Sequence, residues 1–399
     1  MKETLNLSKS TTTSSGAEMI MLSKDVMMDI FSRLRAKTLC RLRCVCKQWR
    51  SLISDPFFKS LHRARSSLKP SLLFLEQKCC STSTTRVSMS SFDLDGNHNF
   101  DFTFTLDSYV YFMPSKWELI CFLGSKGKGF YVCNPSTQEL VNLPNTPTSS
   151  RATLDGIAFG YIKEKNEYVL VNSRFFKNDT VCEVMRWTDG CCLKNLSWKV
   201  VDAKCPYMLR WCGVLVENSF YWIRHRNKYD SIEVIISFDL EKEDFGTVIP
   251  PKDTFDDGGL WSLAELMGML WLFGSPEDIS TMDIWVLKDS KNYMWAKEYT
   301  IDLAGFNFGV RFISILDHKE GKILMDVDSE ILEWYDVDNK CFERVDNLSG
   351  AVHGNGCKSD WGRGRLVLST NCWKISLYHP KFCFQLIDMR ICVEPLKLI

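Results

Sequence analysis

The chain has 399 residues, of which 45% are hydrophobic and 25% charged, a composition typical of globular proteins. Its 49 basic and 49 acidic side chains balance, which argues against a predominantly electrostatic binder of nucleic acid or membrane. At roughly 150 residues per domain, the length predicts two or three domains, or one small and one large. Residues 1–70 carry 14 basic and 5 acidic side chains, whereas residues 71–399 carry 35 and 44. A small basic module is therefore expected before a larger acidic one.

Cysteine usage and hydropathy indicate the compartment. No apolar run approaches the ~18 residues of a membrane span, and the start Met1-Lys2-Glu3-Thr4 lacks the order of a secretory signal. The 17 cysteines then indicate a reducing compartment with mostly free thiols, and their spacing predicts no metal site. We expect a cytoplasmic or nuclear protein, or one found in both, with no cofactor and with neither nucleic acid nor a membrane as partner.

The first part of the chain divides into a tail and a helical module. Residues 1–20 are predicted to be disordered, because their Ser- and Thr-rich run holds too little apolar surface to offset the ordering entropy. In residues 21–66 apolar side chains recur at spacings of three and four, the period of a helix face. They mark a first helix from Leu22 to Leu34, a second helical stretch over 39–53, and a third from Phe57 that ends before Pro70.

After Pro70, over residues 71–399, short aromatic and β-branched runs alternate with polar turns, which predicts an all-β domain. A polar turn residue recurs about every 50 residues, at Asn134, Asp189, Asp239, Asp289 and Asp336. Two apolar residues follow Asn134, Asp239 and Asp336 at the same offsets of six and nine, whereas Asp189 and Asp289 begin looser copies, and Ser91-Phe92-Asp93-Leu94 adds an earlier unit. Such units must stack to bury their faces, so this period predicts a kelch-like β-propeller of six or seven blades. A less regular stack of bent sheets is the alternative.

Motifs for catalysis are not found. The six histidines form no His-Glu-x-x-His motif, and there is no Gly-x-Ser-x-Gly elbow. The glycine-rich run 124–129 predicts a hairpin turn, not a phosphate loop, and residues 93–97 predict a turn, not a calcium loop. Residues 263–273 fit either a helix or a buried strand pair. We therefore expect a protein that is not an enzyme; a propeller enzyme would need converging carboxylates or a metal in its central channel.

The helical module carries a specific motif, Arg41-Leu42-Arg43-Cys44-Val45-Cys46-Lys47-Gln48-Trp49, followed by Asp55-Pro56. Together with Leu22 to Leu34 it resembles an F-box. The resemblance implies a three-helix module that docks on a Skp-type adaptor and, through it, on the cullin and RING subunits of a ubiquitin ligase. Seven apolar residues are expected to divide between the module's core and this docking surface: Leu22, Val26, Ile30, Leu34, Leu39, Val45 and Trp49.

The module lacks two prolines that F-boxes usually have, and the role of its basic residues stays open. F-boxes usually have Leu-Pro before and after the first helix, where this chain has Leu22-Ser23 and Leu34-Arg35. Proline would stiffen the helix entry and exit. The basic residues of the module form either a solvated face or a complement to an acidic adaptor. A DNA-binding helix is the weaker option, since no Asn or Gln pattern suggests base readout.

The β region is similar to the plant F-box-associated interaction domain. Its features follow in order: Asn134-Pro135-Ser136-Thr137, Phe159-Gly160-Tyr161, Phe220-Tyr221-Trp222, Ile236 to Leu240, and Ile284-Trp285-Val286-Leu287. The two resemblances imply an α+β multidomain protein that recruits an unidentified target protein for ubiquitination. A non-ligase scaffold that binds proteins through the same domains is the alternative. Candidate target contacts lie in loops on one propeller face: Arg174, Phe175, Arg224, His225 and Arg226.

Overall fold

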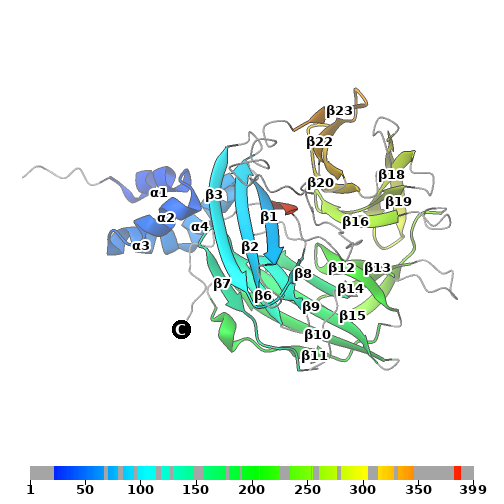
Figure 1. Cartoon of the computed structure of the whole chain (residues 1–399), viewed down its shortest axis with the longest axis horizontal. Coiled ribbons are helices and arrows are strands. Elements are labelled where there is room, and N and C mark those ends of the chain that lie inside the picture. The colour runs from blue at the N-terminus through cyan, green and yellow to red at the C-terminus, as the bar shows by residue number, and fades with distance from the viewer. Residues whose placement is uncertain are drawn as a thin grey trace, which may run out of the picture.

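A computed structural model of the chain has a helical module beside a larger group of β-sheets (Figure 1). The structure describes residues 22–66, 71–79, 84–93, 97–113, 118–125, 129–147, 156–176, 179–188, 191–205, 207–224, 234–252, 254, 260–275, 280–303, 313–327, 331–345 and 382–387. The expected disordered tail over residues 1–20 lies outside them. The predicted order, a small helical module followed by a large, mostly β domain, is confirmed.

The helical module contains four helices, α1 (Lys24–Ser32), α2 (Ala36–Leu42), α3 (Lys47–Ser54) and α4 (Pro56–Ser66), where three were expected. The prediction of one helical stretch over 39–53 is wrong, because the chain turns at 43–45 between α2 and α3. Cys46 is extended, with φ −155° and ψ 163°, and its Sγ accepts a hydrogen bond from the Trp49 backbone N–H. The cysteine therefore acts as an N-cap that starts α3 as a separate helix.

Within the residues that the structure describes, the strands form five sheets. The first has the order β24 (Phe382–Ile387), β1 (Ser71–Cys79), β2 (Thr85–Asp93), β3 (His98–Leu106). The second has the order β4 (Val110–Phe112), β5 (Ile120–Gly124), β6 (Phe130–Asn134), β7 (Glu139–Asn142). Two more sheets follow later in the chain. One has the order β16 (Leu260–Leu266), β17 (Met269–Ser275), β18 (Thr281–Asp289), β19 (Met294–Asp302). The other has the order β20 (Ile313–Lys319), β21 (Lys322–Val327), β22 (Ile331–Asp336), β23 (Cys341–Arg344).

The fifth sheet has eight strands and consists of two four-stranded units. One unit is β8 (Ile157–Ile162), β9 (Glu167–Phe176), β10 (Asp179–Thr188), β11 (Lys199–Val201), with the short helix η2 (Leu193–Asn195) before its last strand. The other is β12 (Leu209–Val216), β13 (Ser219–Arg224), β14 (Ile235–Asp239), β15 (Asp244–Val248). Strands within each unit are antiparallel, whereas β8 and β12 pair in parallel through two residue pairs, Cys212 with Ile157 and Gly213 with Ala158.

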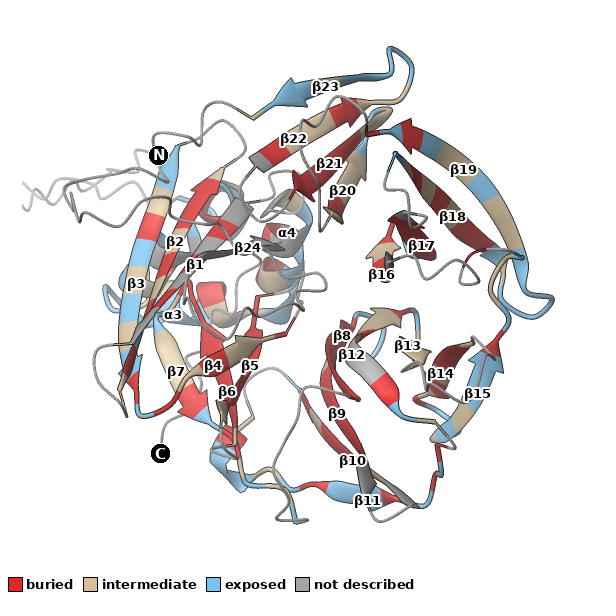
Figure 2. Ribbon diagram, turned by 45° about the vertical axis from the view of Figure 1, so that its right-hand side comes forward, coloured by how far each residue is buried: buried red, intermediate tan, exposed pale blue. Residues whose placement is uncertain are grey.

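The sheets stand side by side around a common centre (Figure 2). The first sheet is built from both ends of the β region, since β24 pairs with β1 from Ser71↔Ile387 to Glu76↔Phe382. Hydrophobic clusters fill the spaces between neighbouring sheets. Between the first two, for example, the Phe122 ring of β5 stacks against Phe104 of β3 with centroids 5.8 Å apart, and on its own sheet it stacks against Tyr131 of β6 at 5.5 Å. The domain core is therefore divided among the contacts between adjacent sheets.

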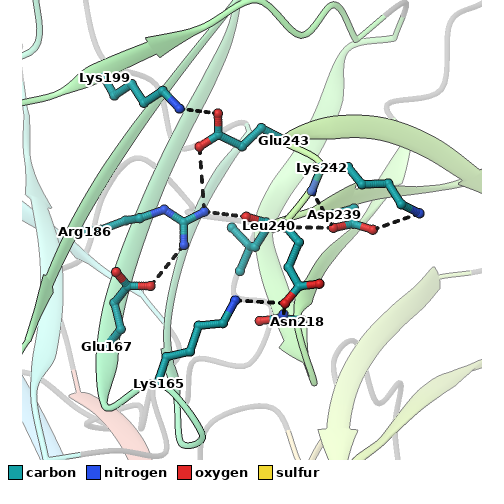
Figure 3. A network of polar contacts seen from close by, with 10 residues as sticks. Lys165, Glu167, Arg186, Lys199, Asn218, Asp239, Leu240, Lys242 and Glu243 are labelled. Carbon is teal, nitrogen blue, oxygen red and sulfur yellow. Dashed lines mark hydrogen bonds and ion pairs between the residues drawn. The ribbon is translucent and has the colours of Figure 1, made fainter.

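A polar network joins the two units of the eight-stranded sheet (Figure 3). Arg186 on β10 donates hydrogen bonds to Glu167 at 3.0 Å and to the Leu240 carbonyl, which follows β14, at 2.6 Å. Glu243, in the same turn as Leu240, accepts from Lys199 at 2.5 Å and lies 3.9 Å from Arg186. The network supplements the two parallel residue pairs that connect the units.

The predicted turn residues recur at one position of the fold. Asn134, Asp239, Asp289 and Asp336 each end the third strand of a four-stranded unit, and the Oδ1 of each accepts backbone N–H groups two or three residues further on. Four residues after each one, the backbone has a positive φ, at Gln138, Glu243, Tyr293 and Lys340. Asp189 lies outside the described residues. These Asx turns give the fold its repeating unit.

Two open choices of the sequence are settled. Residues 263–273 are a strand pair and not a helix, with Leu263 opposite Leu272 in β16 and β17. At the glycine-rich run the Gly124 N–H donates to the Gly129 carbonyl at 2.8 Å between β5 and β6, which confirms a hairpin.

Candidate docking surface on the helical module

One face of α1 forms the core of the helical module. Its buried residues Met27, Met28 and Phe31 pack against Leu39, Leu52, Ile53 and Phe58 from the other three helices. The Phe31 ring meets the Trp49 ring edge-on, with centroids 5.0 Å apart. These contacts explain why the apolar residues repeat at helical spacing.

The other face of α1 is also apolar, but it faces solvent. On this face Val26 and Ile30 are 45% and 43% exposed, and Leu22, which lies two residues before α1 begins and four before Val26, is 50% exposed. Val45, in the turn between α2 and α3, is 62% exposed. A short helix that is apolar on both sides leaves one side available to a partner, because exposed apolar side chains gathered on one element mark an interaction surface.

The seven residues predicted from the sequence thus divide between core and surface. Leu22, Val26, Ile30 and Val45 are exposed, as a docking surface requires. Leu39 is fully buried, so its expected role at the surface is corrected to one in the core. Leu34 and Trp49 are half-buried and pack against the core cluster. The sequence reading missed Phe57, which is 65% exposed at the start of α4; its position directly after Pro56, in the first helical turn, was the available signal.

Helix α4 fixes the C-terminal end of α1. The Arg65 guanidinium donates to the Asp29 carboxylate at 2.7 Å, to the Asp29 carbonyl at 3.1 Å and to the Ser32 hydroxyl. Hydrogen bonds from Arg33 and Arg65 lower the pKa of Asp29, so this carboxyl stays ionised. His62 is buried, and its Nε2 lies 2.8 Å from the Leu34 carbonyl, to which it donates. Burial lowers the pKa of His62, which favours the neutral ring.

Ser23 and Arg35 stand where F-boxes usually have proline. Ser23 caps α1: its hydroxyl accepts a hydrogen bond from the Val26 N–H at 3.3 Å, and its φ is −61°. Arg35 precedes α2 with a φ of −67°. Both angles lie in the range that proline imposes, near −65°. At both positions the backbone therefore has a φ that proline would also adopt.

Of the target contacts predicted in loops of the β domain, the structure describes the side chains of Arg174 and Arg224. Arg174 is buried, with its guanidinium 2.9 Å from the buried Glu183 carboxylate, so its expected role as an exposed contact is wrong. Arg224 is half-buried and lies over the Tyr207 ring, 4.3 Å from its centroid. The side chain of Phe175, and residues His225 and Arg226, lie outside the described residues. Because β8 and β12 run parallel, β9 and β13 end at the same edge of the eight-stranded sheet, and Arg174 and Arg224 lie near those two ends.

Among the described residues, no group of three or more His, Cys, Asp or Glu side chains is placed to hold a metal ion. In the same part of the chain, no helix is long and apolar enough to cross a membrane. The buried thiols are poor nucleophiles, since burial raises the pKa of Cys205 to about 11 and that of Cys182 to about 12.

Two family models match the chain, and the division between them falls where the helices end and the strands begin. Residues 24–64 match an F-box-like family, and residues 71–346 match the family described as F-box associated beta propeller domain. Among solved structures, the chain is similar to an oligogalacturonate lyase in complex with manganese, with a TM-score of 0.40 and 11% identity over 68% of this chain and 78% of that one. That likeness is too low to assign a fold or an activity.

Similar proteins in Arabidopsis thaliana are F-box proteins. F-box protein At1g30790 is 24% identical over 375 residues, 85% of this chain and 92% of that protein. F-box protein DOR is 26% identical over 289 residues, 68% of this chain and 72% of that protein. The associated-domain model alone covers more than half of the chain. The chain therefore belongs to the F-box associated beta propeller domain family, as a plant F-box protein in which a helical F-box module precedes the associated β domain.

Proposed function

We propose that this protein is the target-recruiting subunit of a ubiquitin ligase of the Skp–cullin–F-box type. The F-box module binds a Skp-type adaptor and, through it, the cullin and RING subunits, while the β domain binds a target protein. The observation that carries the proposal is the exposed apolar face of Leu22, Val26 and Ile30 on an F-box module. Fully burying a side chain of this size contributes about 1.5–3 kcal/mol, so a few such residues support a stable complex.

The β domain is proposed to be a six-bladed propeller. The four four-stranded sheets and the two units of the eight-stranded sheet supply six comparable blades, each with its innermost strand toward the common centre. The kelch-like character of the repeat stays a prediction. The second strands of the two units in the eight-stranded sheet, β9 and β13, end at the same edge of that sheet. Target binding is assigned to the loops at that edge, because strands supply the scaffold and loops vary.

The mechanism needs no chemistry in this chain. A target held on the β domain is kept near the ubiquitin-conjugating enzyme that the RING subunit binds. The transfer then occurs at a high effective concentration instead of by random encounter. We propose that the protein is a non-catalytic subunit without a cofactor, that nucleic acid and membranes are not partners, and that it acts in the cytoplasm, the nucleus or both.

Titration calorimetry of the full chain with a recombinant Skp-type adaptor tests the proposal. Submicromolar binding is expected, and Val26→Asp together with Ile30→Asp should weaken it at least tenfold, since each carboxylate must be desolvated in an apolar contact. Val200→Asp is the matched control, because Val200 is 56% exposed on the β domain. Absence of binding by a folded wild-type chain would contradict the proposal and favour a scaffold outside the ligase.

A further inference from the structure

Met267 begins the two-residue turn between β16 and β17, and its place there is unfavourable in two ways. Its φ is 55°, in the left-handed region that few residues other than Gly, Asn and Asp adopt. Its thioether side chain is also 67% exposed to water. The same position of the two-residue turns β12–β13 and β20–β21 holds a charged residue, Glu217 or Glu320, at a φ of 51° or 52°. The turn alone therefore does not account for a methionine at position 267.

The Met267 side chain contacts a histidine of the neighbouring sheet. His318, near the end of β20, is half-buried, and its Nδ1 lies 3.2 Å from the Met267 Sδ. Its other ring nitrogen, Nε2, lies 3.4 Å from the Tyr299 hydroxyl on β19. When Nε2–H donates to this hydroxyl, the lone pair of Nδ1 is directed toward the sulfur. Two potential metal ligands from adjacent sheets are thus brought together.

The surroundings of the two ligands are aromatic and apolar. The Trp271 ring, 2% exposed on β17, lies 5.4 Å from the His318 ring, centroid to centroid. Met269, the first residue of β17, packs against the same hydrophobic cluster as Trp271. Because the two residues are separated by one position on a strand, they share a face, so a second thioether lies at this end of the sheet.

The charge near His318 is slightly negative. Burial lowers the pKa of the His318 ring, which keeps a lone pair available at neutral pH, although Asp317 and Glu298 act in the opposite direction. These carboxylates favour a cation nearby. Glu298 also pairs with Lys288 at 2.5 Å, which reduces the negative charge and makes the surroundings better suited to a monovalent ion than to a divalent one.

A hydrogen bond from His318 Nδ1–H to the Met267 sulfur would also produce the 3.2 Å contact. A thioether is a weak acceptor, however, whereas a positive φ and an exposed apolar side chain both reduce stability. A bond from each side chain to a metal ion is stronger than this hydrogen bond. Metal binding therefore accounts better for the residue that stands at position 267.

We infer that Met267 and His318 bind Cu(I) between the β16–β17 turn and β20, with Met269 as a third ligand. Thioether and imidazole are ligands of Cu(I), whereas Mg²⁺ and Ca²⁺ take oxygen donors and Zn²⁺ does not take thioethers. The Met267 side chain has three rotatable bonds, so its sulfur can move back to admit the ion. The ion would connect two neighbouring sheets and take no part in catalysis. The inference is therefore independent of the proposed function.

The test is a titration of the full chain with Ag(I), a probe for Cu(I) sites that does not change oxidation state, followed by NMR of ¹³C-labelled methionine methyl groups. Exposed thiols such as Cys44 are first capped with N-ethylmaleimide, because thiolates bind the same ions. The Met267 methyl signal, assigned with Met267→Leu, should shift and reach a plateau. His318→Ala should weaken the binding reported by this signal at least about tenfold.

Met294 is the matched control within the same spectrum. Its side chain is 60% exposed at the start of β19, and within the described part of the chain it makes no hydrogen bond to a histidine. Its methyl signal should not move at Ag(I) concentrations that saturate Met267. An equal response of both signals would show that Ag(I) binds any exposed thioether and would overturn the inference.

Thermal unfolding with Cu(I) itself gives a second readout, under anaerobic conditions with ascorbate to keep the ion reduced. Because an ion bound between two sheets stabilises the folded state, Cu(I) should raise the melting temperature of the capped wild-type chain. Met267→Leu keeps the volume of the side chain and should remain folded, but should lose this increase. A Met267 methyl signal that does not move in excess Ag(I), or an equal increase in both proteins, would overturn the inference and leave the hydrogen bond as the account of the contact.

Discussion

The indole ring of Trp222 lies directly over Gly213, so closely that a Cβ at position 213 would stand 2.4 Å from Trp222 Cε2. Gly213 belongs to β12 and pairs with Ala158 of β8 across the junction of the two units. The absence of a side chain lets Trp222 reach across β12, and its Nε1 donates to the Ile157 carbonyl of β8 at 3.2 Å. One tryptophan therefore links both sides of the junction.

Replacing Gly213 with alanine is expected to destabilise the β domain by about 1–3 kcal/mol, because a fully buried indole cannot move aside without disturbing its neighbours. Guanidinium unfolding followed by tryptophan fluorescence measures the effect. Gly246→Ala is the control, since its Cβ would meet only the Ser237 hydroxyl at 2.9 Å, the end of a side chain that can rotate. Equal midpoints for the two variants would contradict this account of the junction.

Arg186→Gln should weaken the same junction by about 1–3 kcal/mol, because the variant loses the charge-assisted bond to Glu167 and the bond to the Leu240 carbonyl. This loss of unfolding free energy should be smaller in 1 M NaCl, since Arg186 is 25% exposed and salt partly screens its ion pairs. Lys242→Gln serves as control: this lysine is 80% exposed, and its pair with Asp239 should contribute almost nothing. Urea unfolding at low and high salt distinguishes the two.

Lowering the pH should destabilise the folded F-box module through protonation of His62. Burial lowers the pKa of this ring in the folded chain, so below the unfolded pKa of about 6.5 the unfolded state takes up the proton first. Stability of the module is thus expected to fall as the pH drops from 7 through 6 to 5. His62→Gln keeps a donor for the Leu34 carbonyl and removes the titrating group, so its far-UV melting temperature should vary less with pH. A variant with the wild-type pH profile would exclude His62 as the cause.

Arg35→Pro should stabilise the F-box module by about 0.4–1 kcal/mol, because Arg35 already has a φ of −67° and proline would restrict the unfolded chain. Ser23→Pro also meets a suitable φ but removes the hydroxyl that caps α1, so it should give no net gain. Thermal melts of the full chain followed at 222 nm compare the two. A lower melting temperature for Arg35→Pro would show that position 35 needs its N–H or its charge.

The turn chemistry of the fold was readable from the sequence. Asn134, Asp239, Asp289 and Asp336 share a local requirement, a short carboxylate or amide that accepts the next backbone N–H groups, and a local requirement leaves a regular spacing in the chain. The junction of β8 and β12 left no such signal. It depends on Gly213 and Trp222, which meet through tertiary packing, and neither residue is unusual in its own strand.

The docking surface was predictable as a group of residues but not residue by residue. Leu39 and Val45 are both apolar and both follow helical spacing, yet one is fully buried and the other is 62% exposed. The difference arises because the chain turns before Cys46, which removes Val45 from the helix that holds Leu39. Phe57 was missed for a different reason: the burial of a residue in the first turn of a helix depends on which helix packs beside it.

The pairing of β24 with β1 has a consequence for synthesis on the ribosome. The F-box module can fold as soon as residues 22–66 have emerged, whereas the first sheet waits for residues 382–387, near the end of the chain. A product that terminates early would therefore carry the F-box module beside an incomplete first sheet. If the module binds an adaptor as proposed, such fragments would occupy adaptors without delivering targets, so a premature stop late in the coding sequence should act as a dominant inhibitor of the full-length protein.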